Sequence, residues 1–249
     1  MQRTSKMNMF YQLYLKDLYD IRTELFLSLI LVFAADLAIF FRVRDPGLAQ
    51  TLAVLAVLIP VTVSFVSAIR ILIKEWTNKT IYLMMSLPVR GIMVLGAKFS
   101  ALMTQYLIST LAAIALGASV IFARIPNFME TLPPKLEIYK VCLCIYALVL
   151  WFMAYLVSLI FLSQMTSRLF RKFQGLISLG VCLLLEWGSS KMIEALTGNV
   201  EIVDLGLSFT ELLMSGKTSG VVFWCLLQAA FTALWLNTAG FIFDKKLEI

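Results

Sequence analysis

The chain of 249 residues contains no histidine and little charge. The absence of histidine excludes hydrolases that rely on a Ser–His pair and metalloproteases with an H-E-x-x-H motif. Charged residues make up 14% of the chain, whereas ordinary soluble domains contain about a quarter. Hydrophobic residues, by contrast, reach 61%. One water-soluble core cannot bury this much apolar surface, so the composition predicts an integral membrane protein.

Cysteine is also scarce, and every cysteine lies inside an apolar run. The four are Cys142, Cys144, Cys182 and Cys225. Thiols in such surroundings are most simply small hydrophobic side chains. Disulfides are the less favoured interpretation, and the sequence predicts no metal site.

Six apolar runs are long enough to cross a membrane, because about 20 helical residues span roughly 30 Å of hydrocarbon. They cover residues 24–42, 48–73, 99–123, 138–163, 173–196 and 220–243. None alternates as a barrel strand would. The predicted fold is therefore an all-α integral membrane protein with six transmembrane helices in one domain, 1–249. The fifth run either spans fully or reaches part of the way, because Glu186, Lys191 and Glu194 interrupt it.

The distribution of lysine and arginine predicts the orientation. With the N-terminus inside, fourteen of these residues fall in cytoplasmic segments and seven on the opposite side. This bias favours both termini in the cytoplasm. Because the basic residues are dispersed among membrane loops, the sequence gives no support to nucleic-acid binding.

Residues 8–22 show helical periodicity before the first run. Their apolar face contains Phe10, Leu13, Tyr14, Leu18 and Ile21. This pattern predicts an interfacial helix on the cytoplasmic surface of the lipid bilayer. The alternative is a soluble N-terminal extension that folds back.

A polar segment, 74–98, separates the second and third runs. Within it, residues 77–88 form a predicted short amphipathic helix that Pro88 ends, because the residue before proline resists the α conformation. About ten residues cannot cross a membrane. The helix is either a docking element for a soluble partner or an interfacial helix that shields its apolar side in lipid.

This segment carries a moderately specific motif, made of Glu75, Thr80, Leu83, Leu87, Pro88 and Gly96–Lys98. It resembles the segment after the second span in type-2 ATP-binding-cassette permeases of the bacterial drug and peptide exporter class. The number of spans, the N-terminal surface helix and the chain length also match. Ala97, between Gly96 and Lys98, departs from the family pattern.

The resemblance implies that the segment is a coupling helix docking on a separate ATP-binding-cassette ATPase. The implied docking residues are Glu75, Trp76, Thr80, Leu83, Met84, Leu87 and Pro88. It also implies a bacterial cytoplasmic membrane location, a second identical or related permease, and an amphipathic cargo such as a peptide, antibiotic or lipid-like molecule. ATP and Mg²⁺ would bind the ATPase, and no cofactor is expected in this chain.

The run Gly91–Lys98 is only a near miss for a phosphate-binding loop, since Ala97 is inserted and Phe99 follows. This chain is therefore not expected to be an enzyme by itself. An intramembrane aspartyl pair of Asp36 and Asp204 is disfavoured, because Asp204 lies in the last loop. A self-sufficient secondary transporter or channel is the alternative function.

Two acidic residues lie inside apolar runs. Asp36 is about two-thirds of the way along the first run, and Glu186 is in the fifth. A carboxylate at membrane depth faces protein or water rather than lipid. The two are candidates to line a substrate path for a cationic or amphipathic molecule. Alternatively, each is hydrated near an interface or bonded within the protein.

Overall fold

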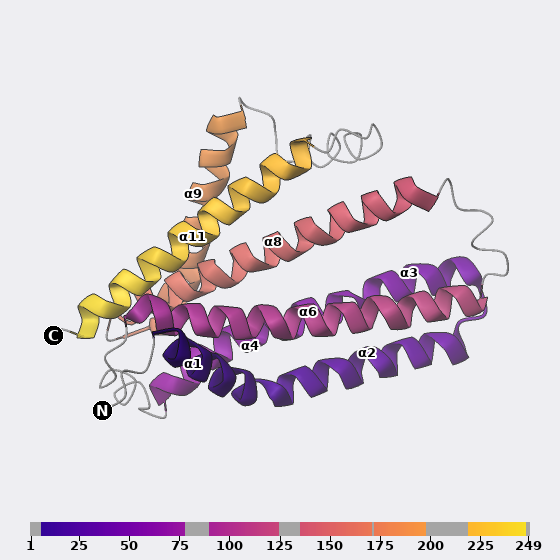
Figure 1. Cartoon of the computed structure of the whole chain (residues 1–249), viewed down its shortest axis with the longest axis horizontal. Helices are drawn as coiled ribbons and strands as arrows, with labels where there is room; N and C mark the ends of the chain where they lie inside the picture. The colour runs from indigo at the N-terminus through magenta and orange to yellow at the C-terminus, as the bar shows by residue number, and fades with distance from the viewer. Residues whose placement is uncertain (1–5, 78–89, 125–134, 171, 198–218, 248–249) are drawn as a thin grey trace. The chain divides into compact units, whose positions relative to one another are not determined.

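The computed structural model describes residues 6–77, 90–124, 135–170, 172–197 and 219–247, and all regular structure in these ranges is α-helical (Figure 1). The chain forms two compact units. The N-terminal unit is Met1–Leu132 and the C-terminal unit is Pro133–Ile249. The predicted short helix within 77–88 lies almost entirely outside the described residues.

Six helical segments are long and apolar enough to cross a membrane, which confirms the predicted fold class. They are Arg22–Arg42, Gly47–Thr77, Gly91–Ala123, Leu143–Ser167, Gln174–Ile193 and Trp224–Lys245. The fifth is 20 residues long, which is a full spanning length despite its charges. The protein is a multi-pass helical membrane protein.

The N-terminal unit is built around one long helix, α6. Four other helices pack against it, and α2, α3 and α6 run side by side in Figure 1. The helices of this unit are α1 (Lys6–Asp20), α2 (Arg22–Arg42), α3 (Pro46–Ala56), α4 (Leu58–Thr77) and α6 (Gly91–Arg124).

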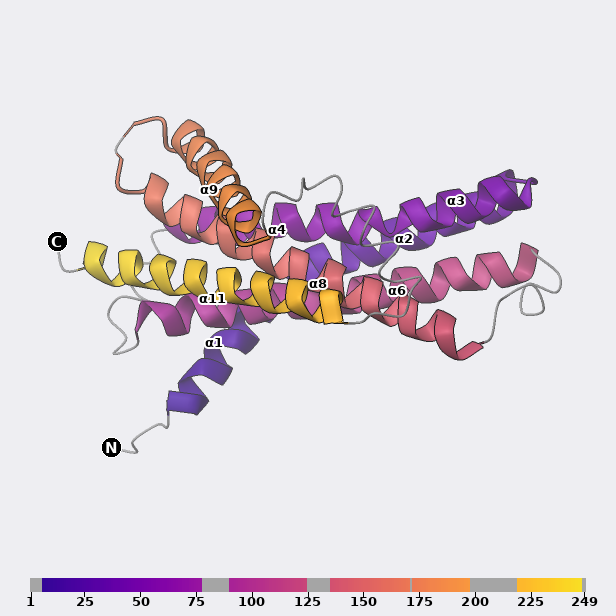
Figure 2. The ribbon, with the colours of Figure 1, turned by 90° about the horizontal axis from the view of Figure 1, so that it is seen from above.

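Helix α1 crosses the first part of α6 (Figure 2). Leu13 packs with Val94 and Ala97 of α6 in a small apolar cluster, which Phe10 and Tyr14 cover. The residues predicted to form the apolar face of α1 are therefore its packed face. The buried Ala97 is part of this contact.

The second apolar run is not one continuous helix. It divides at Val57 into α3 and α4, where the Val57 N–H donates to the Val54 carbonyl at 3.2 Å. Pro60 explains the break, because proline lacks the N–H that would bond to the Ala56 carbonyl one turn earlier. At the other end of α3, Pro46 occupies the first turn and the Asp45 carboxylate accepts a hydrogen bond from the Gly47 N–H, so the helix begins with a favourable cap.

The connection between the second and third spans is shorter than the polar segment 74–98 that the sequence predicted. Helix α4 continues through Thr77 and α6 begins at Gly91. Lys74, Glu75 and Trp76 therefore belong to a membrane-spanning helix, and Lys98 lies two turns inside the next one. Only residues 78–90 connect the two helices.

The C-terminal unit contains α8 (Lys135–Ser167), α9 (Gln174–Thr197) and α11 (Ser219–Leu247). Helix α8 packs against both α9 and α11. Its core centres on Tyr155, Leu159 and Phe231. The rings of Tyr155 and Phe231 form a T-shaped pair with 6.4 Å between their centroids, a geometry that adds to the apolar burial.

Candidate functional site

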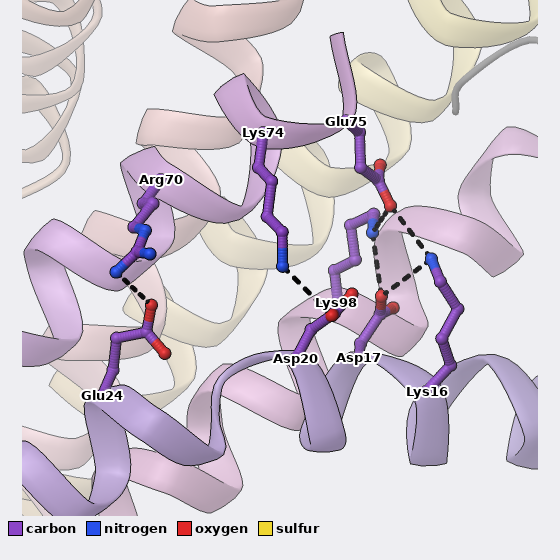
Figure 3. Close-up of polar contacts among 8 residues, drawn as sticks. All are labelled: Lys16, Asp17, Asp20, Glu24, Arg70, Lys74, Glu75 and Lys98. Carbon is purple, nitrogen blue, oxygen red and sulfur yellow. Dashed lines mark hydrogen bonds and ion pairs between the residues drawn. The ribbon is translucent and has the colours of Figure 1, made fainter. Parts of the chain in front are cut away.

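Eight charged side chains gather where α1 meets α2, α4 and α6 (Figure 3). We call this set the charge cluster; it contains four cations and four carboxylates, so their formal charges balance. Its members are Lys16, Asp17, Asp20, Glu24, Arg70, Lys74, Glu75 and Lys98.

The centre of the cluster is the ammonium group of Lys98. Its side chain is only 1% exposed, and Nζ lies 3.0 Å from Asp17 Oδ1 and 2.5 Å from Glu75 Oε1. Lys16 reaches the same carboxylates from the outside, at 3.3 Å from Glu75 Oε1 and 3.7 Å from Asp17 Oδ1. One buried cation thus joins a residue of α1 to a residue of α4.

Helix geometry explains why these side chains meet. Asp17 lies four residues after Leu13 and four before Ile21, and both of these are buried. Residues spaced by four share one face of a helix, so Asp17 belongs to the apolar face of α1. On α6, Lys98 follows Ala97 and lies one turn after Val94, which contact that same face.

Two further ion pairs surround the centre. Lys74 Nζ lies 3.1 Å from Asp20 Oδ1, with both side chains partly exposed. Arg70 lies 2.7 Å from Glu24 Oε1 and joins α4 to the start of α2. The exposed Lys74–Asp20 pair contributes only about 0–1 kcal/mol, whereas the Glu24 side chain is only 12% exposed. Loss of a charged partner is expected to cost most at the buried centre.

Burial raises the pKa of Asp17 above its ordinary value of 3.8, while the neighbouring Lys98 and Lys16 oppose this shift. Asp17 Oδ2 has no hydrogen-bond partner among the described residues. The carboxyl group is therefore held by its lysines at one oxygen and is desolvated at the other.

The predicted docking residues fall into three groups. Glu75 is buried and bonded within the protein, and Trp76 is half-buried at the end of α4. The remaining five lie outside the described residues: Thr80, Leu83, Met84, Leu87 and Pro88. Glu75 thus faces inward, because α4 remains helical to Thr77 and turns this side chain toward α6.

The two candidate path residues belong to different units and have different surroundings. Asp36 is 3% exposed, and neither carboxyl oxygen has a hydrogen-bond partner among the described residues. Glu186 is exposed and accepts a hydrogen bond of 2.7 Å from the Tyr155 hydroxyl. The same hydroxyl lies 2.6 Å from Ser189 Oγ.

Sequence reasoning missed Asp17 and the roles of Lys98 and Tyr155. The position of Asp17 on an apolar helical face was a usable signal, since a carboxylate there requires a buried partner. Nothing in the sequence identified that partner, which is 81 residues away.

The charge cluster is suited to mechanical attachment. It joins α1 to α4 and α6, the two helices that flank residues 78–90. Within the described part of the chain, no three His, Cys, Asp or Glu side chains are grouped to hold a metal ion. Comparisons of the chain with protein-family models, curated proteins and solved structures found no match.

Proposed function

We propose that this chain is the membrane-spanning permease subunit of an ATP-driven exporter. The segment between α4 and α6 docks on a separate ATP-binding-cassette ATPase, which supplies the energy. A second permease, identical or related, completes the path. The cargo is an amphipathic molecule such as a peptide, an antibiotic or a lipid-like compound.

The observation that carries this proposal is the buried ion contact of Lys98 with Asp17 and Glu75. It lies near the ends of α4 and α6 from which residues 78–90 emerge. A force applied to that segment therefore reaches three helices together, because α4, α6 and α1 are joined at this point. If α1, α4 and α6 were not joined at this point, a movement of the docking segment would not be transmitted to all three helices.

Glu75 takes a revised role in this scheme. Its carboxylate contacts Lys98 and Lys16, so it positions the base of the docking segment. Direct contact with the ATPase is assigned to Leu83 and its apolar neighbours. The amphipathic pattern of residues 77–88 and the resemblance to type-2 permeases support this assignment.

The test is reconstitution of the chain in proteoliposomes with candidate soluble ATP-binding-cassette ATPases from the same cell. Leu83→Asp places a charge on the apolar docking face and is expected to weaken co-purification by about tenfold or more, the equivalent of about 1.4 kcal/mol. Glu75→Gln is expected to retain co-purification but to reduce cargo-stimulated ATP hydrolysis. Asp45→Asn is the matched control, because Asp45 is exposed and caps α3 outside the charge cluster.

Two results would contradict the proposal. If Leu83→Asp co-purified with the ATPase as well as the wild type does, the segment between α4 and α6 would not be the docking segment. Uphill flux by the purified chain without an ATPase would instead favour a self-sufficient secondary transporter.

A further inference from the structure

One buried carboxyl group in the N-terminal unit has no role in the charge cluster. Asp36 lies on the packed stripe of α2, together with Ser28, Val32 and Ile39. At 1.5 Å per residue it is about 21 Å along α2 from Arg22, which is well inside the membrane span. Both of its carboxyl oxygens lack a hydrogen-bond partner among the described residues.

Among the described residues, none supplies a compensating charge to Asp36. Helix α3 contains no titratable residue. The described charged side chains of α1, α4 and α6 all belong to the charge cluster. Tyr106 of α6 is the remaining described titratable group on these three helices within the membrane span, and a phenol is neutral near pH 7.

The register of the helices places Asp36 at the level of the break in the second span. Glu24 of α2 pairs with Arg70 of α4, whereas Ile39 packs against Ala49 of α3. Helix α2 runs antiparallel to α3 and α4. Counting three residues inward from the Ile39–Ala49 contact places Asp36 opposite residue 52, and counting twelve residues inward from the Glu24–Arg70 pair places it opposite residue 58. The range 52–58 contains the interruption at Val57.

The break weakens the helix at this level. The Val57 N–H bonds to the carbonyl three residues back, and Pro60 offers no N–H to the carbonyl of Ala56. Such interruptions are the places where a spanning helix deforms most easily. Separation of α2 from this segment would bring water to Asp36.

We infer that Asp36 is a proton-binding site, occupied while α2 packs against the broken helix and vacated when the two separate. An ionised carboxylate without a partner is far costlier in an apolar interior than the neutral acid, so the packed state retains the proton. A metal ion fits less well, because Ca²⁺ or Mg²⁺ requires about six oxygen ligands. No metal-binding group of acidic residues occurs in the described part of the chain. This inference does not depend on the proposed ATPase partner.

Dicyclohexylcarbodiimide tests the protonation state directly. It adds to a protonated carboxyl group: the acid proton moves to a carbodiimide nitrogen and the carboxyl oxygen bonds to the central carbon. The adduct then rearranges to a stable N-acylurea, which retains every atom of both reactants. At about pH 8 only about one in ten thousand ordinary carboxyl groups carries a proton. Asp36 of the full chain in lipid nanodiscs is therefore expected to react at least about tenfold more than the exposed Asp45.

Peptide mass spectrometry measures the adduct, and Asp36→Asn gives the background. Labelling at Asp36 no greater than at Asp45 would overturn the inference. Protection by excess sodium ion, with no effect of pH, would identify a metal cation as the ligand and would overturn it equally.

The pH dependence of stability tests whether proton binding by Asp36 is linked to the separation of α2 from the broken helix. Because the packed state holds a proton that the separated state releases, Asp36 is expected to lower the thermal midpoint of the wild type as the pH rises above about 4. Asp36→Asn keeps the shape of the side chain and removes its titration, so the thermal midpoint of this variant should fall less steeply with pH than that of the wild type. Asp45→Asn should retain the wild-type slope. An equal slope in wild type and Asp36→Asn would refute the coupling.

Discussion

Replacement of Lys98 by methionine is the most informative perturbation of the charge cluster. Methionine retains the length and most of the volume of the side chain but removes the ammonium group. Asp17 and Glu75 then lose the buried cation that contacts both of them. Lys16 remains near each carboxylate, but its side chain is 46% exposed. It therefore compensates only in part.

The magnitude follows from the burial of the three groups. Removing one partner of a buried ion pair costs about 3–5 kcal/mol, because a charge is left without compensation in an apolar site. The residual contact with Lys16 places Lys98→Met near the lower end, at about 3 kcal/mol. By the scaling for soluble chains of 150–250 residues, this corresponds to a fall of about 6–12 °C in the thermal midpoint.

Thermal unfolding in detergent, followed by circular dichroism, measures the effect. Lys74→Met is the matched control, since it removes a lysine from the partly exposed pair with Asp20 and should cost at most about 1 kcal/mol. A triple variant, Lys98→Met with Asp17→Leu and Glu75→Met, removes the stranded charges as well. It should recover most of the lost stability, because well-packed apolar residues of similar volume often replace buried ions without loss.

Equal losses in Lys98→Met and Lys74→Met would show that burial does not govern the strength of the cluster. Failure of the triple variant to recover would show that lost packing, rather than uncompensated charge, explains the single substitution. Either result would refute the electrostatic reasoning.

Three smaller predictions follow from other contacts. Tyr155→Phe removes the hydroxyl that bonds Glu186 and should lower the free energy of unfolding by about 1–3 kcal/mol, measured by chemical denaturation. A Cβ at Gly117 would lie 3.7 Å from the Ala53 carbonyl oxygen, so Gly117→Ala should be tolerated, whereas Gly117→Leu should lower the thermal midpoint by forcing α3 and α6 apart. Burial raises the pKa of Asp17, so the native state holds its proton to higher pH than the unfolded chain. The stability of wild type relative to Asp17→Asn should therefore fall as the pH of a denaturation series rises above about 4.

The arrangement of spans was predictable because it depends on the local chain. An apolar run of sufficient length crosses a bilayer whatever its neighbours are, and α1 followed from the spacing of Phe10, Leu13 and Tyr14. The break at Val57 had a signal in Pro60, but the composition of the run concealed it, since the residues on both sides are apolar.

The charge cluster was not predictable from local pattern. Glu75 was assigned to a docking surface because the resemblance to type-2 permeases implies that role, yet one additional helical turn directs it inward. Its contact with Lys98 spans 23 residues, and that of Lys98 with Asp17 spans 81. Such pairings depend on how helices cross, which a single sequence does not specify. Leu83 and its neighbours remain predictions.

The separation of Asp17 and Lys98 along the chain also affects biogenesis. At about 5–20 residues per second, a ribosome needs roughly 4–16 s to add the residues between them. During that interval α2, α3 and α4 can enter the bilayer while the acidic side chain of α1 still faces water. The contact of Asp17 with Lys98 can therefore form only after the third span has been synthesised. The native arrangement of the N-terminal unit thus requires that all three of its spans have been inserted.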